Sequence, residues 1–114
     1  MKKENIEFVA LGRNQIEFYD SGGKEYINIY DPNPRASLGI CLNLRSCKVT
    51  KFKKSGYKIE IGNKMYVFKI SEHQGGFVAK IVGKLWGWLP IIWFSGEFSR
   101  VGYDLFIRKM ERYT

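Results

Sequence analysis

For acid–base catalysis the chain offers eleven carboxylates but only one histidine. His73 follows Glu72 in a predicted turn, and a ribonuclease needs a histidine acid and a carboxylate base within hydrogen-bonding reach of one substrate. Glu60, with Arg45 or Lys64, is the candidate partner, but nothing in the spacing of these residues predicts that they meet. We therefore expect a protein without enzymatic activity, and a small ribonuclease is the least favoured alternative.

The sequence carries no pattern for a cofactor or a metal ion, and we expect neither. The pair Gly75-Gly76 lacks the spacing and the following Lys-Ser/Thr of a phosphate-binding loop. Cys41 and Cys47 have no nearby histidine or further cysteine, so we expect no zinc site and interpret both as small buried residues. Reduced cysteines, and an N-terminus that runs directly into a strand pattern, indicate a cytoplasmic protein.

Positive charge is concentrated in the middle of the chain, whose net charge is +8. Residues 32–93 hold eleven basic and two acidic residues, whereas residues 1–31 hold four basic and six acidic ones. A field of this sign attracts an acidic protein, an anionic lipid headgroup or nucleic acid without choosing among them. The candidate partner-binding residues are a dense basic run and the next lysine: Arg45, Lys48, Lys51, Lys53, Lys54 and Lys58.

Three interpretations of this basic run are open. The simplest is a solvated edge strand whose lysines discourage pairing with another chain. The second is a rim that binds phosphates or carboxylates, with lysines acting as point charges. The third is nucleic acid, bound through charge without sequence preference, because most aromatic residues alternate like core residues and offer no stacking platform. We favour a binding module that docks an acidic protein or an anionic lipid headgroup.

The segment Leu85–Phe94, LWGWLPIIWF, contains all three tryptophans and no charged residue. Such a segment is most often part of the core, and Trp86, Trp88 and Trp93 are otherwise candidates for a second partner contact or a peripheral membrane contact. The segment is too short to cross a bilayer, so we expect no transmembrane segment.

The most specific structural signal lies between residues 57 and 70. Two alternating runs, Tyr57–Ile61 and Lys64–Ile70, flank the dipeptide Gly62-Asn63, and this two-residue loop is typical of a β-hairpin because both residues accept positive φ. The loop predicts the register: Ile59 opposite Tyr66, Tyr57 opposite Phe68, Lys58 opposite Val67 and Glu60 opposite Met65.

Alternating polarity predicts further strands. They are Ile6–Leu11 and Gln15–Tyr19, with Leu11 opposite Ile16 and Val9 opposite Phe18, then Glu25–Asp31, Ala36–Leu44 and Cys47–Phe52. Apolar residues at helical spacing predict a short helix at Phe77–Trp88, with a strand as the alternative, and Pro90 is expected to end this element. Alternation across Glu97–Met110 predicts a last strand.

Together these elements predict a single β-rich domain over residues 1–114. Aromatic residues make up 16% of the chain, which favours pleated, half-buried surfaces. The expected fold class is mainly β: an antiparallel partly open barrel or bent sheet of seven to nine strands, with at most one short helix.

Three segments resemble the strand sequence of a pleckstrin-homology-type domain: FVALGRNQIEFYDS at Phe8–Ser21, LNLRSCKVT at Leu42–Thr50 and YKIEIGNKMYVFKIS at Tyr57–Ser71. In that family such segments follow in this order and a C-terminal helix caps them, so the resemblance implies a helix at Phe77–Trp88. The family's first strand and basic loop, which bind phosphoinositides, have no counterpart before Phe8, and the resemblance therefore assigns no ligand residues here.

Overall fold

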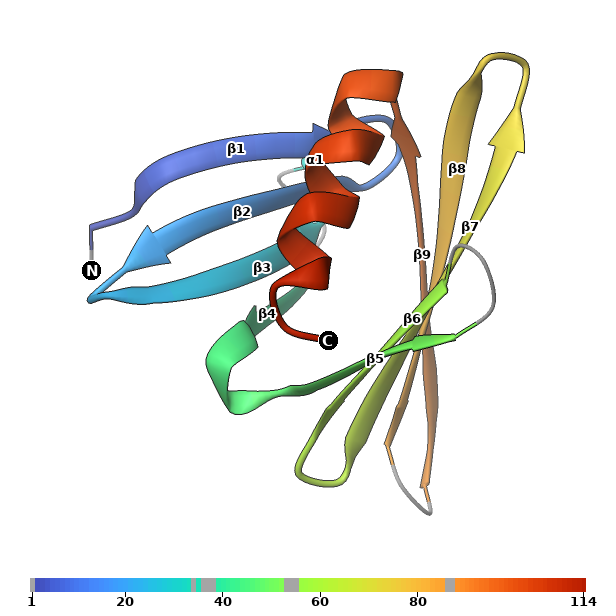
Figure 1. The fold of residues 1–114 in the computed structure, drawn as a ribbon. Helices are drawn as coiled ribbons and strands as arrows, with labels where there is room; N and C mark the ends of the chain where they lie inside the picture. The colour runs from blue at the N-terminus through green and yellow to red at the C-terminus, as the bar shows by residue number, and fades with distance from the viewer. Residues whose placement is uncertain (1, 34, 36–38, 53–55, 86–87) are drawn as a thin grey trace.

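The computed structural model describes residues 2–33, 35, 39–52, 56–85 and 88–114 (Figure 1). The elements are β1 (Glu4–Ala10), β2 (Gln15–Ser21), β3 (Lys24–Tyr30), β4 (Gly39–Asn43), a short 3₁₀ turn η1 (Leu44–Ser46), β5 (Lys48–Phe52), β6 (Gly56–Ile61), β7 (Lys64–His73), β8 (Gly76–Leu85), β9 (Trp88–Phe98) and α1 (Arg100–Glu111). The prediction of a mainly β, antiparallel chain of seven to nine strands is confirmed.

The described strands form two antiparallel sheets, ordered β1-β2-β3-β4 and β5-β6-β7-β8-β9. Figure 1 shows the two sheets as separate layers, with α1 beside the space between them. The layers meet at one corner, where Leu11 and Glu97 exchange backbone hydrogen bonds of 3.0 and 2.9 Å. At the opposite side β4 leads into β5 through η1, and the two sheets are bent around the core without closing into a barrel.

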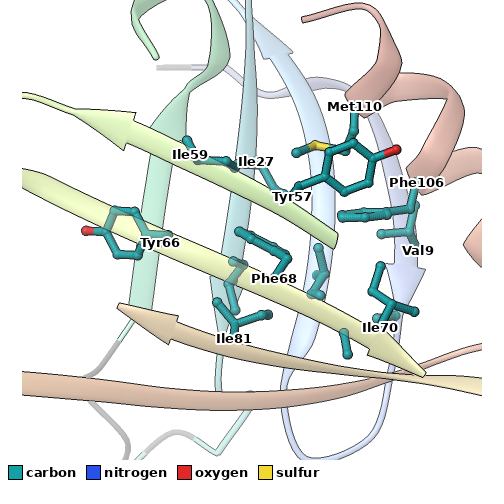
Figure 2. Close-up of a cluster of buried hydrophobic side chains, with 14 of the residues drawn as sticks. Val9, Ile27, Tyr57, Ile59, Tyr66, Phe68, Ile70, Ile81, Phe106 and Met110 are labelled. Atoms are coloured by element: carbon teal, nitrogen blue, oxygen red, sulfur yellow. The ribbon is translucent and has the colours of Figure 1, made fainter. Parts of the chain in front are cut away.

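The core lies between the sheets and reaches α1. Ile27 from the four-stranded sheet and Tyr57 and Phe68 from the five-stranded sheet are fully buried (Figure 2). Phe106 of α1 joins the two layers, because its ring centroid lies 6.1 Å from that of Phe18 in β2 and 5.8 Å from that of Tyr57 in β6. Full burial of such side chains stabilises a fold by about 1.5–3 kcal/mol each.

The β6–β7 hairpin confirms the predicted register. Gly62 has a φ of 58°, the left-handed value that the two-residue loop requires. The four predicted pairs form: Ile59–Tyr66, Tyr57–Phe68, Lys58–Val67 and Glu60–Met65. The first two pairs are buried, and the other two lie on the outer face. Local turn chemistry was sufficient to align these strands.

The β1–β2 hairpin forms over the predicted segments, but its predicted register is wrong. The observed pairs are Ala10–Ile16 and Glu7–Phe18, in place of Leu11–Ile16 and Val9–Phe18, with two register shifts along β1. Leu11 instead pairs with Glu97 of β9 and is 57% exposed. Such bulges bend a strand, and here they accompany the turn of β1 toward the second sheet.

The next three predicted strands are present as β3, β4 and β5. Strand β4 covers Gly39–Asn43 of the predicted Ala36–Leu44, residues 36–38 lie outside the described residues, and Leu44 is the buried first residue of η1.

Strand β8 replaces the predicted helix at 77–88 over its described part, and the strand alternative was right there. Every second residue is buried, as in a strand that lines a core: Phe77, Ala79, Ile81 and Gly83. Pro90 lies within β9 rather than ending the segment before it. Proline is tolerated there because β9 is the edge of its sheet, where one side of the strand has no ladder hydrogen bonds to lose.

The predicted last strand at 97–110 is wrong, since residues 100–111 form α1. The hydroxyl of Ser99 caps the helix by accepting the Gly102 N–H at 3.1 Å. A Cβ at Gly102 would collide with the Val9 carbonyl oxygen, so glycine allows α1 to lie directly against β1. The described α-helix therefore follows the last strand and does not lie at Phe77–Trp88, where the resemblance implied one.

Candidate functional site: the outer face of the five-stranded sheet

The structure does not bring the four described cations of the predicted basic surface together on one face. Arg45 is exposed in η1, beside the C-terminal end of α1. Lys48 in β5 and Lys58 in β6 lie on the outer face of the five-stranded sheet. Lys53 and Lys54 lie outside the described residues.

Lys51 lies three residues after Lys48 in β5, and its side chain forms an ion pair with another part of the protein. Its Nζ lies 2.9 Å from Oε1 of Glu111 in α1, and the hydroxyl of Tyr57 donates to the same oxygen at 3.1 Å. These two hydrogen bonds hold the pKa of the Glu111 carboxyl below its usual range. Lys51 therefore contacts α1, on the side of β5 opposite to Lys48.

The register of the five-stranded sheet assembles a different set of lysines. Outward-facing residues alternate with the buried ones and align into rows across β5 to β9. The first row is Lys48, Glu60, Met65 and Lys84; the second is Thr50, Lys58, Val67 and Val82; the third is Lys69, Lys80 and Ser95. We call Lys48, Lys58, Lys69, Lys80 and Lys84 the lysine face.

Most of this charge is uncompensated. Lys58 has Glu60 within 3.5 Å. The other four lysines make no ion pair with a carboxylate in the described part of the chain. Lys69 and Lys80 are direct cross-strand neighbours, and like charges in that position repel each other. The lysine face therefore provides ammonium groups that are available to an anion.

The lysines surround three apolar residues. Met65, Val67 and Val82 are half-buried and occupy adjacent positions in the first two rows. An apolar centre with a charged rim is the usual organisation of a protein interface. The face can therefore combine contact with apolar groups and attraction of negative charge.

The structure does not show where the side chains of the three candidate tryptophans lie. Trp86 lies outside the described residues, and only the backbone of Trp88 and Trp93 is described, in β9. Their assignment to core, partner or membrane stays a prediction. In the described residues, no helix is long and apolar enough to span a bilayer.

The residues considered for catalysis lie apart. Glu60 is opposite Met65, whereas His73 is exposed at the far end of β7, eight residues from Met65. At about 3.4 Å per residue this separation is ~27 Å. The expectation of buried cysteines is wrong, because Cys41 is exposed and Cys47 is half-buried. No group of metal-binding side chains occurs among the described residues.

Three lysines of the face were missed by sequence reasoning. Lys69 alternates with the buried Phe68 and Ile70, a signal already present in the predicted hairpin. The helix prediction for residues 77–88 does not place Lys80 and Lys84 on the lysine face. Only a strand puts both on the same face of the sheet as Lys69.

Comparison with family models, with curated proteins and with solved structures found no match to this chain.

Proposed function

We propose that this protein is a non-enzymatic binding module that docks an acidic partner, either a protein or an anionic lipid headgroup, on the lysine face. The observation that carries the proposal is the direct juxtaposition of Lys69 and Lys80, neither of which makes an ion pair with a carboxylate among the described residues. Repulsion between such neighbours disfavours the folded state, and a bound anion relieves it. The half-buried Met65, Val67 and Val82 supply an apolar centre for the contact.

Protection of a sheet edge does not account for these lysines. Charged residues discourage strand addition where a strand has an unpaired side. Lys69 and Lys80 belong to β7 and β8, and each of these strands is paired on both sides. Among the five lysines, only Lys48 lies in an edge strand, β5.

We also propose a relationship to pleckstrin-homology-type domains as the family background of this binding function. Two antiparallel layers followed by a C-terminal helix support that relationship in outline. The free cysteines Cys41 and Cys47 support a cytoplasmic setting. Neither the family relationship nor the cytoplasmic setting identifies a ligand.

The test compares two double charge reversals. Lys69→Glu/Lys80→Glu alters the lysine face, and Lys2→Glu/Lys24→Glu makes the same change in net charge at two exposed sites, one ahead of β1 and one at the start of β3. Binding is measured to vesicles containing phosphatidylserine, to poly-glutamate and to a single-stranded oligonucleotide. We expect the wild-type protein to bind the vesicles or poly-glutamate, with affinity falling as salt rises.

The Lys69/Lys80 variant should lose more than about tenfold in affinity, because each lysine near an anionic surface contributes about 1 kcal/mol. The Lys2/Lys24 variant should retain the wild-type affinity within about threefold. Equal losses in both variants would mean that binding depends on net charge alone, which contradicts a specific binding face. Tight binding to the oligonucleotide alone would favour the nucleic-acid alternative.

A further inference from the structure

A second site is suggested by a hollow of about 660 Å³ beside the C-terminal end of α1. Its walls come from the start of β1, the β2–β3 turn, η1 and the end of α1 (Figure 1). Pockets for small molecules commonly have volumes of ~300–1,000 Å³. The hollow shares no residue with the lysine face, so its occupant is a separate question from the proposed function.

The floor of the hollow is a closed ionic network. The ammonium of Lys109 lies 2.8 Å from Oε2 of Glu25 and 3.2 Å from Oε1 of Glu7. The hydroxyl of Tyr113 donates to the other oxygen of Glu25 at 2.8 Å. These groups satisfy one another's hydrogen bonds and hold α1 on the sheet, so the floor is rigid. The side chains of the walls are therefore the ones available to contact a ligand.

One wall presents two free guanidinium groups. Arg45 of η1 and Arg112, the C-cap of α1, both line the hollow, and neither makes an ion pair in the described part of the chain. Both act on the Tyr113 hydroxyl: burial and Glu25 raise the pKa of Tyr113 to about 12, and the two arginine charges oppose this rise. Arginine is the side chain best suited to hold a carboxylate, because its planar fork donates two parallel hydrogen bonds.

The other wall carries two carboxylates, Glu4 and Asp20, and one exposed lysine, Lys24, so it is acidic on balance. Glu4 is exposed and makes no ion pair in the described residues, and Asp20 accepts only the Asn5 amide, at 3.0 Å. In total four basic and four acidic residues line the hollow. A polyanion would meet these carboxylates, and a simple cation would meet the arginines. The charge distribution is complementary to a molecule that carries both signs.

We infer that the hollow binds a small zwitterion, an amino acid or the like, whose carboxylate is held by Arg45 and Arg112 and whose cationic group lies toward Glu4 and Asp20. Both walls are needed for this selectivity. A ligand with one charge satisfies one wall and leaves the other unpaired.

The experiment is a titration followed by amide chemical shifts, with 4-aminobutyrate and 6-aminohexanoate as zwitterions and butyrate and butylamine as singly charged controls. We expect at least one zwitterion to bind saturably, about tenfold or more tighter than either control, because each charged hydrogen-bonding group is worth at least that factor. Arg45→Gln/Arg112→Gln should abolish the binding. The matched control, Arg35→Gln/Arg108→Gln, removes two exposed arginines that do not line the hollow and should retain it.

Glu4→Gln tests the acidic wall with an effect of opposite sign on the two ligand classes. This exposed substitution should weaken the zwitterion and strengthen butyrate, since it removes a carboxylate that attracts the first and repels the second. The inference is overturned if no zwitterion saturates, if butyrate binds as tightly as 4-aminobutyrate, or if the Arg45/Arg112 variant binds like the wild type.

Discussion

Lys109 is a charged side chain inside the fold, 6% exposed, and its closest partner Glu25 is 8% exposed. Burial alone would lower the pKa of Lys109, but hydrogen bonds and charge from Glu25 and Glu7 outweigh burial and raise it. Lys109 therefore stays charged and links α1 to β1 and β3. A buried pair adds little net stability, yet removing one member leaves the other charge without compensation.

Lys109→Met is accordingly expected to destabilise the protein by about 3–5 kcal/mol. The double variant Lys109→Met/Glu25→Leu should be less destabilised than the single one, because no unpaired buried carboxylate remains at position 25. Urea unfolding measures both. Arg108→Met, at an exposed position on the same helix, is the control and should change stability by less than about 0.5 kcal/mol. A single variant no worse than this control would show that the pair is not a stabilising link.

The role of Lys109 was not accessible from the sequence. Its partner Glu25 lies 84 positions away, and the segment around Lys109 was interpreted as a strand. Charge alone marks both residues as surface groups, since lysine and glutamate are rarely buried unless they are paired. Only the folded structure, in which Lys109 of α1 reaches Glu25 of β3, identifies them as partners.

Among the helices and strands, local sequence signals are sufficient where turn chemistry is decisive and fail where two periodicities compete. The β6–β7 register followed from the Gly62-Asn63 loop. For α1, the alternation from Val101 to Ile107 imitated a strand, although Val101 is 77% exposed and the buried Phe106 and Met110 are four residues apart. Ser99, a favoured helix-capping residue, was the signal that was overlooked.

The position of α1 yields a second prediction, at Gly102. Alanine is a better helix former than glycine by about 1 kcal/mol, so propensity alone predicts that Gly102→Ala stabilises the protein. The collision with the Val9 carbonyl oxygen predicts the opposite, and we expect a net loss of about 1–3 kcal/mol. Thermal or urea unfolding decides between them. Val101→Ala, at the exposed neighbour, should change stability by about 0.5 kcal/mol or less; stabilisation by Gly102→Ala would disprove the close approach.

Across the protein, the sequence predicts the excess of positive charge but not its arrangement on the surface. The described cations of the run at 45–54, which are Arg45, Lys48 and Lys51, are distributed between η1 and two sides of β5. The lysine face instead draws single residues from β5, β6 and β7 and two from β8. A surface of this kind depends on strand order and register, which are non-local, so it can be identified only once the pairing of β7 with β8 is known.

The tyrosines make a third prediction, because burial raises the pKa of five of the seven: Tyr19, Tyr30, Tyr57, Tyr66 and Tyr113. For Tyr19 and Tyr113 the pKa reaches about 12. In the unfolded chain these phenols ionise near pH 10, whereas the folded state keeps their protons. Their contribution to stability is complete below about pH 10 and is lost as the pH rises toward the folded pKa, with the same sign for Lys109.

We therefore expect the free energy of unfolding to fall above about pH 10, by up to ~1.4 kcal/mol per pH unit for each proton that only the folded state retains. Loss of positive charge from a protein of net charge +8 would reduce self-repulsion and act in the opposite direction, so the sign of the slope shows which effect is larger. Urea unfolding at pH 8, 9.5 and 11 measures it. Tyr113→Phe should flatten the alkaline slope. A stability that is level or rising between pH 9.5 and 11 would show that the tyrosines with raised pKa do not dominate.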